Sequence, residues 1–271
     1  FRMSNRGIGK NGPIALAFHA IFTLFIAAPL LVIMLVSFSD KGFISMPFDG
    51  ASLRWYRAIV DAPELTNAFW LSVWLGLGSA TLATVVSIPA AIAISRYRFI
   101  GRDALTALLL SPLMIPHVVL GVAFLRFFSL MGWTGSFFAL LLVHALIVVP
   151  YSLRLTLGAI IGLDRDAELA ARSLGASRWT SFRRILLPLI MPGVVGGWVL
   201  AFIQSFDEVT MTVFVATPGT TTLPVALYHR VALLTDPVTT SVSTVMIVGT
   251  MLMMFILDRA VGLNKVLIGK K

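Results

Sequence analysis

The stretch from residue 164 to residue 193 reads DRDAELAARSLGASRWTSFRRILLPLIMPG, and it leads from a short polar segment into a long apolar one. Asp164 is a residue type that can cap a helix N-terminus. Four small or aliphatic residues then follow at the spacing i, i+3, i+4, i+7: Ala167, Ala170, Ala171 and Leu174. This spacing predicts a short helix with one apolar face. Gly175 stands where a left-handed residue would end it, and Ser177 where a second helix would begin.

The predicted short helix has the features of a segment that docks into another protein. A face made of alanines protrudes little and can lie deep in a groove, while Arg172 and Arg178 can meet acidic residues at its rims. The plainer alternative is a surface loop that connects two membrane spans. We favour docking.

The composition of the chain is typical of a membrane protein. Of its 271 residues, 58% are hydrophobic and only 12% are charged, which excludes an ordinary soluble domain. The net charge of +9 could suggest a nucleic-acid partner, but the basic residues lie between long apolar runs and form no continuous basic face, so none is expected. The chain has no cysteine, so disulfides, thiolate metal sites and cysteine nucleophiles are excluded.

Six apolar stretches approach the roughly 20 residues that a helix needs to cross about 30 Å of hydrocarbon. They are residues 14–38, 68–94, 104–131, 137–161, 185–206 and 241–257. The sequence therefore predicts an all-α polytopic membrane protein with about six spans, forming a single domain over residues 1–271. Most Lys and Arg residues lie at the two termini and in the connections around 96–102 and 154–184. This bias predicts that both termini and residues 164–184 are cytoplasmic, and that the bilayer surrounds the chain.

A family resemblance emerges from these residues. The pattern Ala170-Ala171-x-x-x-Gly175, with an acidic residue just upstream and with Ile185-x-Leu187-Pro188 downstream, resembles the EAA signature of permease subunits of type I ABC importers. Leu169 occupies the position at which that family usually has glutamate, and Glu168 lies one place earlier. The resemblance implies that residues 164–177 form a coupling helix that docks on a cytoplasmic ATPase. Residues assigned to coupling are Asp164, Ala167, Glu168, Ala170, Ala171, Arg172, Leu174, Gly175 and Ser177.

Shorter motifs resemble the polyamine-type branch of the same family, whose relatives import putrescine, spermidine and other small charged solutes. They are Ser111-Pro-Leu-Met-Ile-Pro116, Ser205-Phe-Asp-Glu-Val209 and Thr222-Leu-Pro224. The resemblance implies a bacterial inner-membrane protein that pairs with a second, different permease subunit, an ATPase dimer and an extracytoplasmic solute-binding protein. It also implies that ATP and Mg²⁺ bind the ATPase, with no cofactor in this chain.

Two features are candidates for the translocation path or its gate. Pro112 and Pro116 each remove a backbone donor, so residues 104–131 should bend or unwind there. The result is either a break that lines a cavity or a simple helix kink. Asp207 and Glu208 end the fifth apolar stretch, where charged groups usually face a cavity or a partner. They could guide a cationic solute, cap the helix, pair with Arg230 or hold an external gate.

An enzymatic function finds no support in the sequence. It contains neither HExxH nor GxSxG, and its four histidines have no metal-ligand spacing, so we expect no catalytic and no metal residues. The alternative function is a secondary transporter or channel that works without an ATPase. A membrane-embedded scaffold without a path is a third possibility.

Overall fold

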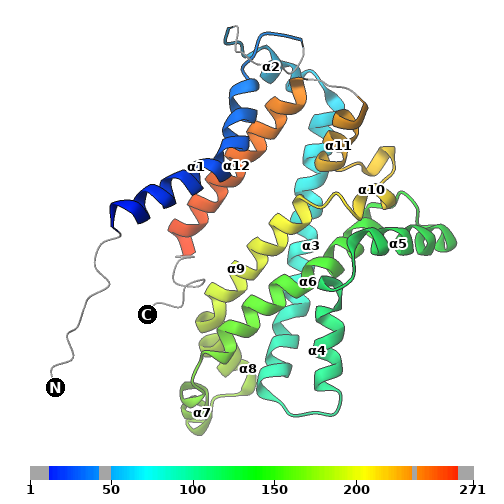
Figure 1. Ribbon diagram of the computed structural model, residues 1–271. Coiled ribbons are helices and arrows are strands. Elements are labelled where there is room, and N and C mark those ends of the chain that lie inside the picture. Colours follow the sequence, from blue (N-terminus) through cyan, green and yellow to red (C-terminus); the bar gives the residue numbers. More distant parts are fainter. Residues whose placement is uncertain (1–11, 43–49, 234–236, 262–271) are drawn as a thin grey trace. The chain divides into compact units, whose positions relative to one another are not determined.

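Nearly all of the chain that the structure describes is helical, which confirms the all-α prediction. The computed structural model describes residues 12–42, 50–233 and 237–261, and these contain no strand (Figure 1). The contacts divide the chain into two units, Phe1–Asp61 with Leu234–Met251, and Ala62–Leu233 with Leu252–Lys271. Each unit is described by itself below.

The first unit consists of α1 (Pro13–Val36), the short α2 (Arg54–Val60) and most of α12 (Pro237–Val261). The polar atoms of Ser37, just after α1, connect all three. Its hydroxyl lies 2.6 Å from the Tyr56 hydroxyl of α2, and its carbonyl accepts from Ser241 Oγ of α12 at 3.2 Å. Most side chains of α1 are apolar and exposed, as expected for a helix that faces lipid or another subunit.

The core of the second unit is formed by α3 (Pro63–Arg96), α6 (Phe137–Ile161) and α9 (Leu187–Phe206), which lie side by side (Figure 1). Two glycines allow α9 to approach α6 closely. A Cβ added at Gly193 would lie 2.4 Å from the Ala159 Cβ, and one at Gly197 would lie 2.9 Å from the Ser152 carbonyl oxygen. Small residues of this kind let helix backbones touch, which is how membrane helices pack without a hydrophobic driving force.

A buried hydrogen-bonded cluster also fastens these helices to each other. His144 of α6 is fully buried, with Nδ1 2.9 Å from the Ser205 hydroxyl of α9 and Nε2 3.0 Å from the Thr212 hydroxyl. Ser79 of α3 lies 2.8 Å from the same Ser205 hydroxyl. Both ring nitrogens of the histidine are therefore satisfied by side chains. The cluster fixes how three core helices and the segment after α9 meet.

The predicted span at residues 104–131 is broken. It consists of α4 (Arg102–Leu110), a 3-10 turn η1 (Ser111–Leu113) and α5 (His117–Met131), with a bend of 99° between the two parts. Pro112 lies in η1, and Pro116 is the N-cap of α5. Because Pro116 lacks an N–H and restricts the residue before it, the chain leaves helical geometry there. The alternative of a simple kink is therefore wrong.

Short elements lie at the two ends of the bundle (Figure 1). At one end are α7 (Asp166–Ser173), α8 (Arg178–Ser181) and a π-helical turn, η2 (Phe182–Leu186), which runs directly into α9. At the opposite end are α10 (Thr212–Val215), η3 (Pro218–Thr220) and α11 (Leu223–Leu233).

Four described helices are long and apolar enough to cross a membrane, or up to five if the bent pair counts as one span. They coincide with four of the six expected stretches: Pro13–Val36, Pro63–Arg96, Phe137–Ile161 and Arg178–Phe206. The bent pair matches residues 104–131. The sixth stretch, 241–257, falls in α12, whose described apolar part, Pro237–Met253, is shorter than a typical span.

Candidate coupling segment and translocation site

Local hydrogen bonds explain why residues 164–177 form a helix, a sharp turn and the start of a second helix. The N–H groups of Gly175 and Ala176 donate to the carbonyls of Arg172 and Ala171, both at 3.0 Å, which is the Schellman pattern of helix termination. Gly175 has φ +90°. A residue with a side chain could adopt this left-handed conformation only at a cost in free energy. Ser177 is the N-cap of α8, and its hydroxyl accepts from the Thr180 N–H at 3.1 Å. Both local predictions are confirmed.

The prediction for Asp164 needs a correction. The N-cap position of α7 is Arg165, and Asp164 lies one residue earlier. The Asp164 carboxylate still accepts from the N–H of Asp166 at 3.2 Å, so it satisfies one free donor of the first turn from outside the helix.

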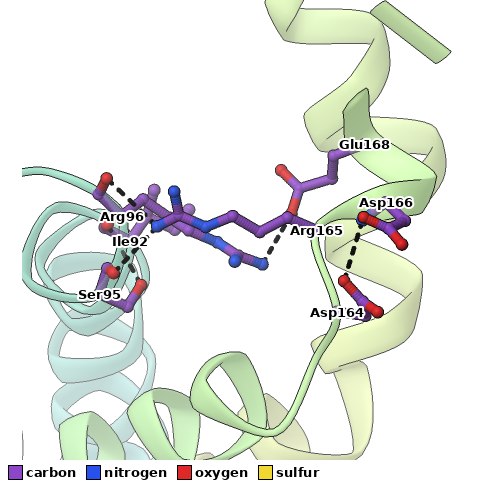
Figure 2. Close-up of polar contacts among 7 residues, drawn as sticks. All are labelled: Ile92, Ser95, Arg96, Asp164, Arg165, Asp166 and Glu168. Carbon is purple, nitrogen blue, oxygen red and sulfur yellow. Dashed lines mark hydrogen bonds and ion pairs between the residues drawn. The ribbon is translucent and has the colours of Figure 1, made fainter. Parts of the chain in front are cut away.

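One ion pair and two hydrogen bonds to backbone carbonyls fasten α7 to the last turn of α3 (Figure 2). Arg96 donates to the Glu168 carboxylate at 2.7 Å, and both side chains are largely buried. Arg165 donates to the carbonyl oxygens of Ser95 and Arg96 at 3.2 and 3.3 Å. These carbonyls end a helix, where free acceptors and the helix dipole favour a cation. Glu168 therefore serves as an internal anchor for α7.

The residues of α7 divide between two opposite faces. Residues 165, 168, 169 and 172 point toward α3 and α8, where they line one groove. At about 100° per residue, positions 167, 170, 171 and 174 lie on the other side of the helix. Ala167, Ala170 and Leu174 are exposed, Leu174 to 89%, and Ala171 is half-buried. We call Ala167, Ala170, Ala171 and Leu174 the outward face of α7. The family's usual glutamate position, here Leu169, belongs to the groove side.

We expect Glu168→Gln to loosen α7 without unfolding the bundle. A charge-assisted hydrogen bond between partly exposed groups is worth roughly 1 kcal/mol, so amide hydrogen exchange over residues 166–174 should accelerate about fivefold. Asp166→Asn is the matched control, because it removes the same charge from an exposed side chain that makes no ion pair among the described residues. Equal exchange in the wild type and in Glu168→Gln would show that the pair does not hold α7.

The broken span and the two acidic residues meet at the other end of the bundle. His117, the first residue of α5, has its Nδ1 2.7 Å from the Glu208 carboxylate. The second Glu208 oxygen accepts from the Met211 N–H at 2.7 Å, and this side chain is only 7% exposed. Glu208 thus ties the start of α5 to the chain after α9. Sequence reasoning missed this role of His117, because 91 residues separate the partners.

The two acids have different surroundings. Asp207 caps α9 through its backbone N–H, and its side chain is exposed, whereas Glu208 is buried. Arg230 donates to Glu64 at 2.7 Å, and neither Asp207 nor Glu208 pairs with it, so that alternative is wrong. Among the described residues, no three His, Asp or Glu side chains are grouped as metal ligands.

Comparisons with known proteins agree with the sequence motifs. Residues 83–264 match the family described as "Binding-protein-dependent transport system inner membrane component". The chain is 32% identical over 225 residues to the spermidine/putrescine transport system permease protein PotC of Escherichia coli, which covers 83% of this chain and 85% of that protein. For PotC of Haemophilus influenzae, the identity is 34%, and the coverage is 86% and 90%. The putrescine transport system permease protein PotI of Escherichia coli is 30% identical, with 82% of each chain covered.

Solved structures share the fold. A bacterial ABC transporter involved in the import of the acidic polysaccharide alginate gives a TM-score of 0.75 at 15% identity, covering 96% of this chain and 98% of that one. The MetNI methionine ABC transporter gives 0.60 at 20% identity, covering 74% and 95%. The family match spans most of the chain and includes α7, the broken span, α6, α9 and the part of α3 from residue 83 onward. This chain belongs to the binding-protein-dependent transport system inner membrane components, and it is a permease subunit of an ABC importer.

Proposed function

We propose that this chain is one of two permease subunits in an importer of small cationic organic solutes of the polyamine type, and that α7 couples it to separate ATPase subunits. Relatives that are 30% to 34% identical carry spermidine or putrescine in their names, which supports this class of substrate. In this proposal ATP and Mg²⁺ bind the ATPase dimer, and a solute-binding protein delivers the substrate. The chain spans the inner membrane with both termini and α7 on the cytoplasmic side.

The observation that carries the coupling role is the division of α7 into two faces. One face is fastened to α3 by the Arg96–Glu168 pair, so a force on α7 is passed to a long core helix. The outward face is apolar, shallow and exposed, which leaves it available for a groove in another protein. In a helix that only connected two spans, an exposed Leu174 would contribute nothing to stability, because no partner would bury it.

The broken span and the segment after α9 are the proposed region of the translocation path. Non-helical backbone at membrane depth is tolerated where it is buried in protein or lines a cavity. Pro112 and Pro116 create such backbone next to the His117–Glu208 pair. We propose that Glu208 holds this region together and that Asp207, whose carboxylate is exposed, attracts the cationic solute.

The proposed function is tested by uptake into vesicles that contain the complex isolated through a tag on this chain. Labelled putrescine or spermidine should accumulate only when ATP is enclosed on the ATPase side, and an ionophore that collapses ion gradients should not prevent it. Uptake that continues without ATP and stops with the ionophore would favour the secondary-transporter alternative and contradict the proposal.

The two acidic residues should respond differently to neutralisation. We expect Asp207→Asn to raise the KM for a polyamine about threefold to tenfold, because an exposed carboxylate near a cation contributes on the order of 1 kcal/mol, with little change in the maximal rate. Glu208→Gln should instead lower the yield of folded chain, since a buried pair with His117 is lost. An unchanged KM in Asp207→Asn would exclude the guiding role.

A further inference from the structure

A groove of about 630 Å³ lies between the last turns of α3, α7 and the α8–η2 segment. Its polar part is formed by four arginines and one glutamate: Arg96, Arg165, Arg172, Arg178 and Glu168. Its apolar part includes Ile88, Ile92, Trp179, Phe182 and Leu186. The groove therefore combines a positively charged end with an apolar wall.

At the positively charged end of the groove, two of the four arginines have guanidinium groups that are able to bind an anion. Arg96 is paired with Glu168, and Arg165 bonds to the end of α3. The guanidinium groups of Arg172 and Arg178, in contrast, have no acceptor in the part of the chain that the structure describes. Two planar guanidinium groups that share one groove are suited to bind a phosphate group, with which they can form bidentate hydrogen bonds.

Two residues that line the groove each have a buried polar atom without a hydrogen-bond partner among the described residues. The Nε of Arg96 and the hydroxyl of Ser181 are inaccessible and make no hydrogen bond within the described residues. Ser181 is only 3% exposed, so leaving its hydroxyl unsatisfied carries a cost. Because both atoms are buried, a ligand in the groove would reach them only after neighbouring side chains move.

The apolar wall indicates that the ligand has a hydrocarbon part. From Ile88 to Arg96 the wall rises along α3 by about 12 Å, at about 1.5 Å per residue. This is the end of a helix long enough to cross a membrane, so the arginines lie where headgroups lie and the isoleucines lie toward the hydrocarbon. A free phosphate would use the arginines alone and leave the wall unoccupied.

From these observations we infer that the groove between α3, α7 and η2 binds an anionic phospholipid, with its phosphate at Arg172 and Arg178 and an acyl chain along Ile88 and Ile92. This site goes beyond the proposed function. It takes Arg172 and Arg178, which the sequence assigned to contacts with the ATPase, into a groove on the side of α7 opposite to the outward face. A bound anionic lipid would stabilise the contact of α7 with α3 and η2, while the outward face of α7 remains free.

The test is native mass spectrometry of the purified full chain with phosphatidylglycerol or phosphatidylcholine of the same acyl chains. We expect phosphatidylglycerol to be retained about tenfold better, and R172Q/R178Q to lose about tenfold of that retention. R183Q/R184Q is the matched control: it removes the same two charges from exposed neighbours that do not line the groove, and it should bind like the wild type. R172K/R178K, which keeps the charge, should retain much of the binding.

Three outcomes would overturn the inference. Equal retention of the two lipids by the wild type would do so without any variant, so the test stands even if R172Q/R178Q does not fold. Equal losses in R172Q/R178Q and R183Q/R184Q would reduce the effect to general surface charge. Displacement of phosphatidylglycerol by excess inorganic phosphate, with phosphate itself retained, would show a free-anion site and not a lipid site.

Discussion

Replacing Leu174 with aspartate is expected to remove the ATPase from the complex, with co-purification through a tag on this chain falling at least about tenfold. Leu174 is 89% exposed at the end of the outward face of α7, and its burial in a partner groove would contribute about 1.5 to 3 kcal/mol. An aspartate there loses this contribution and would have to be desolvated in an apolar groove. Tenfold corresponds to about 1.4 kcal/mol, so the loss of binding should be easily measured.

The control uses the opposite face of the same helix. Leu169→Glu adds the same charge, restores the glutamate usual for the family, and places it in the groove among arginines. We expect ATPase binding to remain within about twofold of the wild type. ATP-driven uptake should follow binding in both variants. Retention of the ATPase by Leu174→Asp, with the chain still folded, would show that the outward face is not the docking surface.

The second large effect is expected at the contact between α6 and α9. A Cβ on residue 193 would lie 2.4 Å from the Ala159 Cβ and 2.8 Å from the Leu155 carbonyl oxygen, and a backbone atom cannot rotate away. Gly193→Val should therefore force the two helices apart, at a cost at or above the roughly 1 to 3 kcal/mol typical of overpacked cores. We expect the yield of monodisperse chain to fall about tenfold and the melting temperature to drop.

The matched control is Gly158→Val in α6. The substitution is identical, but an added Cβ at residue 158 meets nothing within 4 Å. Because valine is a better helix former than glycine, this variant should be as stable as the wild type or slightly more so. Size-exclusion profiles and thermal melting of both variants in the same detergent provide the comparison. Equal stability of the two variants would contradict the role of Gly193 in packing.

What the sequence could predict depends on the distance over which each feature is determined. The turn at Gly175 and the cap at Ser177 involve residues within five positions, so local rules suffice. Pro112 and Pro116 predict a disruption, but the 99° bend also depends on how α5 packs against the segment after α9. Local rules fix where the helix stops and leave its new direction open.

Contacts between residues far apart in the sequence could not be predicted for the same reason. Arg96 and Glu168 are 72 positions apart, and His144 meets Ser205 and Thr212 across 61 and 68 positions. The sequence contains two GxxxG patterns, Gly158–Gly162 and Gly193–Gly197, and their surroundings differ although their spacing is the same. The pattern at 193–197 forms a close helix contact, whereas a Cβ added at Gly158 would meet nothing within 4 Å. Only the way in which the helices pack distinguishes the two.

The π-helical turn between α8 and α9 affects how motion can reach the core. A π-helix bonds each N–H to the carbonyl five residues back, so the turn at Phe182–Leu186 contains one residue more than an α-helical turn. Each residue of an α-helix advances about 100°, and the extra residue offsets the side chains on its two sides by about that angle. A shift of the backbone hydrogen bonds by one residue would change this angle between the side chains before and after the turn, while the helix remains continuous. A displacement of α7 can therefore reach α9 as a rotation about the helix axis as well as a shift along it.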